Sequence, residues 1–125
     1  VRFLVFYLLC GVAAALVHAA VDPASEIPLI GASGAIAGLI GAYLMLYPRV
    51  RMWVLIFMRI PLRLPAYLVL FAWLAMQLFF IAAGDQSGTA WWAHIGGFAA
   101  GVLLVPFFKR RGVPLFGGGG GAAAA

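Results

Sequence analysis

The sequence of 125 residues has few charged side chains. Charged residues make up 9% of the chain, only three of them are Asp or Glu, and 66% of all residues are hydrophobic. A soluble domain carries about 45–50% apolar and about 25% charged residues. The composition therefore excludes a water-soluble domain with a single core. It indicates a membrane protein that contacts the lipid bilayer.

Cysteine and clustered metal ligands are also scarce. The single cysteine, Cys10, lies inside an apolar run, where it has no partner for an internal disulfide and is expected to be a small packing residue. The two histidines are distant in sequence and do not form a cluster of metal ligands. We expect no metal and no organic cofactor. The net charge of +5 indicates basic cytoplasmic loops, not a nucleic-acid partner.

The chain has no initiator Met, and no small-residue cleavage site of a signal peptide follows its first apolar run. We expect it to be a piece of a longer protein. Residues 1–111 are predicted to form a transmembrane domain that is incomplete at its N-terminus. Residues 112–125 form a low-complexity Gly/Ala tail that cannot bury a face.

Four segments are apolar enough to be membrane-spanning helices, each of which needs about 20 mostly apolar residues. The predicted spans are residues 3–20, 32–47, 64–83 and 91–108. The apolar segment 52–58 is too short to span, so we expect it to lie along the membrane interface or to begin the third helix. These patterns predict an all-α membrane protein.

The loops predict the orientation of these helices. With the first helix starting in the cytoplasm, all basic residues fall inside and the three acidic residues, Asp22, Glu26 and Asp85, fall outside. The positive-inside rule then places the basic loops and the C-terminus in the cytoplasm. We expect a multi-pass protein of a bacterial inner membrane. The basic residues are Arg2, Arg49, Arg51, Arg59, Arg63, Lys109, Arg110 and Arg111.

Small residues recur at four-residue spacing on the second and fourth predicted helices. Such stripes allow helix backbones to approach closely in lipid, where apolar burial gives little attraction between helices. We expect these two helices to pack together, with Gly38, Gly97 and Gly101 at the contact. The two stripes are Gly34, Gly38 and Ala42, and Ala93, Gly97 and Gly101.

Ser33 and His94 are the strongest candidates for chemistry. Ser33 alone has an ordinary explanation as a helix cap or packing residue, and His94 alone could be satisfied by a carbonyl. Together, near the outer ends of two helices predicted to touch, they are suited to act as a nucleophile and its base. His18, near Asp22, is expected to be interfacial, with a lesser chance of lining a cavity. Gln77 is expected to form an interhelical hydrogen bond.

The residues around Ser33 also suit a nucleophile. Backbone N–H groups at a helix start lie at the positive end of the helix dipole and can stabilise an oxyanion. Gly31 and Gly34 leave room for a substrate backbone. The spacing Gly31-Ala32-Ser33-Gly34 differs from the G-x-S-x-G nucleophile elbow, which requires a preceding strand. No strand is predicted here.

These motifs resemble those of the rhomboid intramembrane serine proteases. The resemblance rests on Gly31-Ala32-Ser33-Gly34 and on residues 93–101, which match the pattern A-H-x-x-G-x-x-x-G. It implies a catalytic dyad without an acid, in which Ser33 is the nucleophile and His94 the general base. It also implies that the backbone N–H groups of Ala32 and Ser33 contribute to the oxyanion hole.

The chain departs from this family in two respects. Rhomboids have a core of six helices, and an earlier helix carries H-x-x-x-N, which nothing here matches. The four predicted helices resemble the last four of that core, and residues 1–125 alone are not expected to be active. Some members also have an aromatic residue one turn after the serine, where this chain has Ala37.

Three classes of function follow from this sequence. The first is an intramembrane endopeptidase that cleaves transmembrane segments of other membrane proteins. The second is a non-catalytic rhomboid-like protein that binds partners as an accessory subunit of a larger membrane complex. The third, a transporter or channel, is weaker, because the predicted spans contain no Asp, Glu, Lys or Arg.

Overall fold

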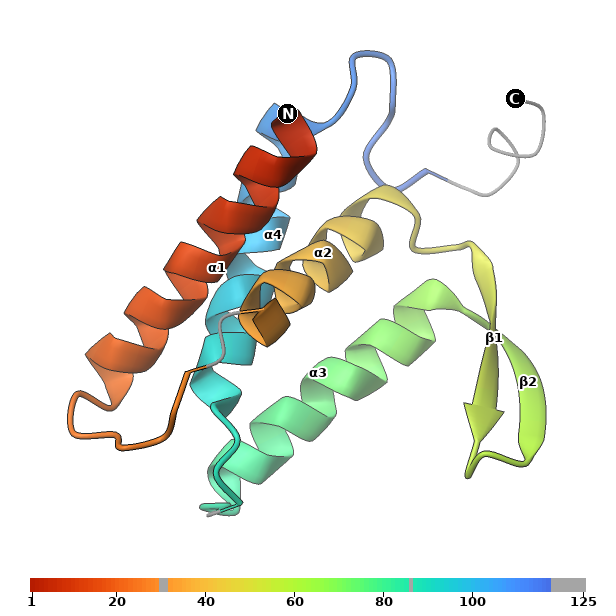
Figure 1. Cartoon of the computed structure of the whole chain (residues 1–125). Helices are drawn as coiled ribbons and strands as arrows, with labels where there is room; N and C mark the ends of the chain where they lie inside the picture. The colour runs from red at the N-terminus through yellow and green to blue at the C-terminus, as the bar shows by residue number, and fades with distance from the viewer. Residues whose placement is uncertain (30–31, 86, 118–125) are drawn as a thin grey trace.

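The computed structural model describes residues 1–29, 32–85 and 87–117 of the chain. It contains four helices and a two-stranded antiparallel sheet within these residues (Figure 1). The predicted helices are confirmed, and their ends differ from the predicted ones by at most two residues. The elements in order are α1 (Arg2–Val21), α2 (Ala32–Leu46), β1 (Arg51–Ile56), β2 (Ile60–Pro65), α3 (Ala66–Ala82) and α4 (Trp91–Phe108).

Helices α2 and α4 touch through glycines. A Cβ added at Gly97 would overlap the carbonyl oxygen of Gly34, and one added at Gly101 would overlap that of Gly38. One turn further along α2, a Cβ at Gly41 would overlap the carbonyl oxygen of Phe98. The two backbones are therefore in direct contact at three points along about two turns of α2, with no side chain between them.

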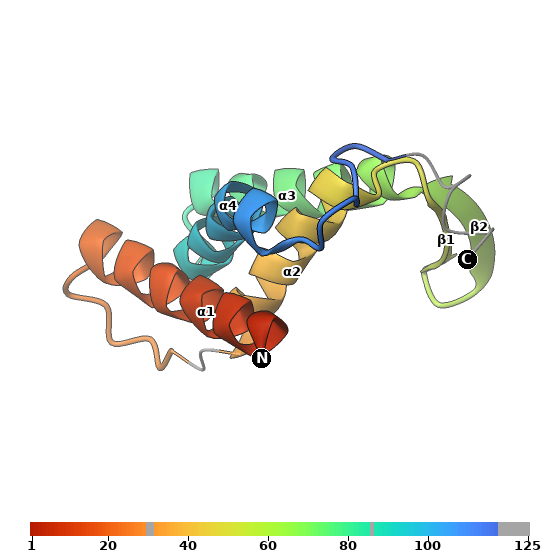
Figure 2. The same ribbon diagram turned by 90° about the horizontal axis from the view of Figure 1, so that it is seen from above.

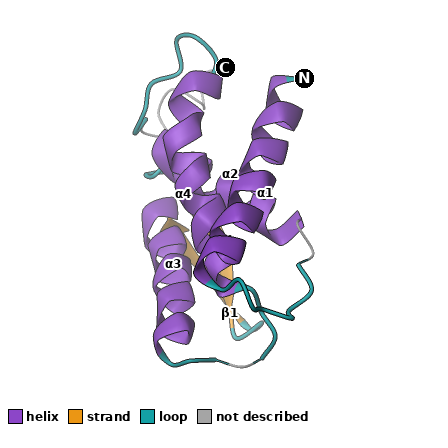
Figure 3. Ribbon diagram, turned by 90° about the vertical axis from the view of Figure 1, so that its left-hand side faces the viewer, coloured by secondary structure: helices purple, strands orange, loops and turns teal. Residues whose placement is uncertain are grey.

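Helix α1 packs against both α2 and α4 (Figure 3). The side chains of Ala14 and Cys10 fill the positions where Gly34 and Gly38 would carry a Cβ, and the side chain of Val17 does the same at Gly96. Cys10 is completely buried, as expected of a packing residue. These contacts extend the close packing of α2 and α4 into a three-helix unit.

Helix α3 lies on the opposite side of α2 and α4 from α1, as Figure 2 shows from above. It contacts the other helices through one stripe of side chains at three- and four-residue spacing. Ala66 and Leu70 belong to a buried cluster with residues of α2 and α4, and Trp73 packs against the same cluster. Gln77 continues the stripe and is only 1% exposed.

The segment from Arg51 to Pro65 forms a hairpin, in which Arg51 pairs with Pro65 and Ile56 with Ile60. The expectation that residues 52–58 begin the third helix is therefore wrong. Phe57 and Met58, in the turn, have φ values of 51° and 58°. Bulky residues rarely adopt this left-handed conformation, which glycine and asparagine adopt more readily. Because the turn contains neither glycine nor asparagine, the sequence carried no signal of a hairpin.

The lengths and exposed faces of the helices suit a bilayer. Among the described residues, α1 and α4 are long and apolar enough to cross a membrane, and α2 and α3 are shorter apolar helices. The outward face of α1 is formed by large apolar side chains, which lipid can cover. These are Phe3, Leu4, Leu8, Val12 and Leu16.

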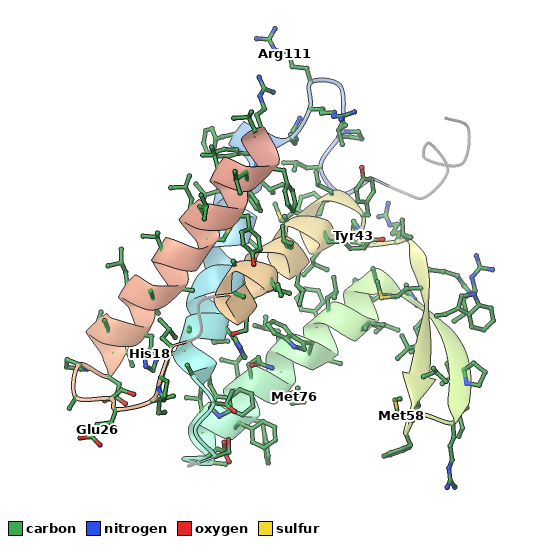
Figure 4. The ribbon with its side chains drawn as sticks, viewed as in Figure 1. His18, Glu26, Tyr43, Met58, Met76 and Arg111 are labelled. Carbon is green, nitrogen blue, oxygen red and sulfur yellow. The ribbon has the colours of Figure 1, made fainter. Side chains whose placement is uncertain are left out.

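Basic and acidic residues lie at opposite ends of the helices. Figure 4 shows Arg111 at one end and Glu26 at the other. The hairpin is an exception to this separation of charges. Figure 4 shows Met58, in its turn, at about the same height along the bundle as Met76 on α3, and the basic residue Arg59 follows Met58 directly. Open sheet edges do not occur in lipid-exposed hydrocarbon. We therefore expect the hairpin to lie in water or among headgroups.

Replacing Gly97 with leucine should separate α2 from α4. Its Cβ would meet the backbone of Gly34, which cannot move aside as a flexible side chain does. Overpacking of this kind costs about 1–3 kcal/mol or more, so thermal unfolding in detergent should occur at a lower temperature. The matched control is Ala99→Leu, at an exposed position of the same helix. Equal stability of the two variants would contradict the contact.

Candidate functional site

The first turns of α2 and α4 carry the two residues that the sequence identified as candidates for chemistry. Ser33 is the second residue of α2 and is exposed, and His94 lies in the first turn of α4 and is half-buried. Ala32 begins α2, at the positive end of its dipole. Gly31, the first glycine of the proposed motif, lies outside the described residues.

The two helix backbones approach each other one residue away from each candidate. The carbonyl oxygen of Ala93 lies 3.5 Å from the position that a Cβ on Gly34 would take. Gly34 follows Ser33 directly, and Ala93 directly precedes His94. The contact between Gly34 and Gly97 lies one turn further along α4 and keeps the two backbones close together here.

The imidazole of His94 has a polar partner on α3. Its Nδ1 atom lies 2.7 Å from Oε1 of Gln77. The sequence predicted an interhelical hydrogen bond for Gln77 but did not identify its partner. The four-residue spacing of Trp73 and Gln77 places both side chains on one face of α3, but it does not indicate His94 as the partner.

Aromatic rings surround the same imidazole. The ring centroids of Trp73 and Trp91 each lie 6.0 Å from that of His94, and Trp91 presents an edge-to-face geometry of 82°. Trp91 is itself held by stacking on Phe80, with centroids 4.8 Å apart and planes 8° apart. The indole N–H of Trp91 donates to Oδ2 of Asp85 at 3.0 Å.

Comparison with known proteins identifies the family of the chain. The Rhomboid domain model matches residues 1–111, which is most of the sequence. The chain belongs to the rhomboid family. Rhomboid proteins are membrane-embedded and are typically serine proteases. No curated protein and no solved structure matched this chain.

In this rhomboid chain, the residue one turn after Ser33 is an alanine, Ala37, and not the aromatic residue that some rhomboids have there. Ala37 is completely buried and belongs to the cluster that contains Leu70 and Phe98. Trp73 from α3 packs against that cluster and lies beside His94. The aromatic neighbours of the histidine therefore come from α3 and from α4 itself.

His18 lies at the same end of the rhomboid bundle as Glu26, near the start of α4 (Figure 4). It lines a cavity of about 150 Å³ together with Asp22, Asp85 and Trp91. Both ring nitrogens of His18 are buried, and neither has a hydrogen-bond partner among the described residues. Such a polar cavity has room for a few water molecules, each about 30 Å³ in the liquid.

A larger cavity, of about 740 Å³, opens at the opposite end of the bundle. Apolar and aromatic side chains of α1, α2 and α4 form most of its lining, to which Arg2, Lys109 and Arg110 also contribute. None of the candidate residues lines it. No group of three His, Cys, Asp or Glu side chains that could hold a metal occurs in the part of the chain that the structure describes.

Asp85 should keep its charge at lower pH than an ordinary aspartate. Hydrogen bonds from Ser87 and Trp91 hold the pKa of Asp85 below its usual value. The ionised carboxylate of Asp85 therefore stabilises the folded protein at neutral pH. This stabilisation is lost as the pH falls through the lowered pKa that Asp85 has in the folded state. Tryptophan fluorescence during acid titration in detergent should report this transition through Trp91.

The transition should be absent in Asp85→Asn and retained in the control Asp22→Asn. A transition centred at the usual pKa of aspartate would contradict the hydrogen-bonded arrangement. So would its persistence in Asp85→Asn.

Proposed function

We propose that the chain is the catalytic part of an intramembrane serine endopeptidase, with Ser33 as nucleophile and His94 as general base. The observation that carries the proposal is the glycine contact between α2 and α4, which brings the backbones together beside both residues. Membership of a family of typical serine proteases supports the same chemistry. A serine hydroxyl needs such a base because it is a weak nucleophile at neutral pH.

In the proposed reaction, Oγ of Ser33 attacks the carbonyl carbon of the scissile peptide, and Nε2 of His94 takes the hydroxyl proton. Backbone N–H groups at Ala32 and Ser33 stabilise the oxyanion, since they lie at the positive start of α2. His94 then gives its proton to the departing amine. Water, activated by the same histidine, hydrolyses the acyl-enzyme and restores Ser33.

The proposed substrates are transmembrane segments of other membrane proteins, cleaved near their outer ends. The peptide must be locally unwound, because an intact helix does not present its carbonyl carbon to a nucleophile. Family membership supports action within the bilayer. We further propose that the domain ends near residue 111, that the basic loops and C-terminus face the cytoplasm, and that the membrane is a bacterial inner membrane.

The alternative is a non-catalytic rhomboid protein that binds partners within a larger membrane complex. The observation that favours it is the buried Ala37, at a position where some rhomboids have an aromatic residue. Retention of both Ser33 and His94 favours the protease.

Substitution of either dyad residue should abolish proteolysis. The full-length protein would be reconstituted in vesicles with a membrane-embedded substrate, and Ser33→Ala and His94→Ala should each reduce kcat by at least about 100-fold. The matched controls are Ser25→Ala, in the loop after α1, and His18→Ala, which removes the other histidine.

Both controls should cleave the substrate. Undiminished cleavage by folded Ser33→Ala would contradict the mechanism. A wild-type protein that binds membrane partners without cleaving any substrate would support the accessory role instead.

A further inference from the structure

The side chain of Gln77 is a polar group on the buried face of an apolar helix. The stripe of α3 that faces the bundle consists of Ala66, Leu70, Trp73 and Gln77. Among the described residues, Gln77 is the largest side chain that is fully buried. A buried amide without hydrogen bonds is unfavourable, because it has lost its bonds to water and gained none in the protein. Its retention at this position therefore requires bonding partners.

Both ends of the amide have a partner. Nε2 of Gln77 donates to the carbonyl oxygen of Trp73 at 3.4 Å, and Oε1 lies 2.7 Å from Nδ1 of His94. An amide oxygen can only accept a hydrogen bond. Nδ1 of His94 must therefore carry the proton, and its N–H donates a hydrogen bond to Oε1 of Gln77.

This arrangement determines the tautomer of the imidazole. A neutral histidine has one protonated and one unprotonated ring nitrogen, and the bond made by one nitrogen sets the state of the other. With Nδ1 protonated, the lone pair that can take a proton is on Nε2. The rings of Trp73 and Trp91 limit rotation of the imidazole away from this position.

We propose that Gln77 is a positioning residue, which holds His94 in the tautomer whose Nε2 accepts the proton of the serine. This rests on the proposed function. Gln77 orients the imidazole as the carboxylate does in a Ser-His-Asp triad. In such triads, loss of the correct histidine tautomer strongly reduces kcat. The amide does so without a buried charge, which would be costly at this depth. The Nδ1–H bond also strengthens when the ring becomes cationic during the reaction.

The tautomer can be measured without any assay of activity. The ¹⁵N chemical shifts of the imidazole nitrogens distinguish protonated from unprotonated sites, and the resonances that disappear in His94→Ala are those of His94. In the full-length protein in detergent, at a pH where the ring is neutral, we expect Nδ1 protonated and Nε2 unprotonated. A protonated Nε2 in the neutral ring would overturn the proposal.

Gln77→Met removes the acceptor at similar volume. We expect the Nε2-protonated tautomer to become populated, and kcat to fall by about 10- to 100-fold while KM is nearly unchanged. This loss is part of the roughly 10²- to 10⁴-fold rate increase that a general base contributes. Gln77→Glu keeps an acceptor oxygen, so Nδ1 should stay protonated whether the ring is neutral or cationic. The control Leu70→Val loosens the same face of α3 and should lower thermal stability without changing the tautomer.

An unchanged tautomer and full turnover in folded Gln77→Met would overturn the proposal. Such a result would leave the dyad intact, because Ser33→Ala would still abolish cleavage. Conversely, continued cleavage by Ser33→Ala would contradict the proposed function, whereas the tautomer measurement would still report on Gln77.

Discussion

The arrangement of this molecule depends on the direct contact between the glycines of α2 and α4. Because no side chain separates Gly97 from Gly34 or Gly101 from Gly38, the two helix starts are held close together. Lipid provides little hydrophobic attraction between helices, so close backbone packing supplies the dispersion contacts that hold them. Helix α1 reinforces the pair by filling the space beside Gly34 and Gly38 with small side chains.

The site built on this contact is polar on one side and aromatic on the others. The glycine contact brings the backbones next to Ser33 and His94 together, whereas α3 contributes Gln77 and Trp73 around the imidazole. The loop after α3 adds Asp85, which anchors the ring of Trp91. Contacts with α3 and with the loop after it therefore restrict the position of this histidine on α4. The proton transfer that we propose for His94 requires such a restriction.

The sequence predicted the helices well and the hairpin poorly, for physical reasons. Long apolar runs ended by proline or polar residues define helices locally, whereas the turn at Phe57 and Met58 uses a conformation that those residues rarely adopt. Small-residue spacing indicated that α2 and α4 would meet. The bond between Gln77 and His94 joins residues of different helices, so no local pattern could identify it, although the buried stripe of α3 pointed towards the bundle.

The most direct test of the account is to identify the residue that a fluorophosphonate probe modifies in the full-length protein in its membrane. Such probes react with an activated serine, so peptide mass spectrometry should locate the adduct on Ser33. The adduct should be lost in His94→Ala, because the hydroxyl then lacks its base. Proteolysis by a protein in which Ser33 stays unmodified, with the adduct on another residue, would contradict the central claim.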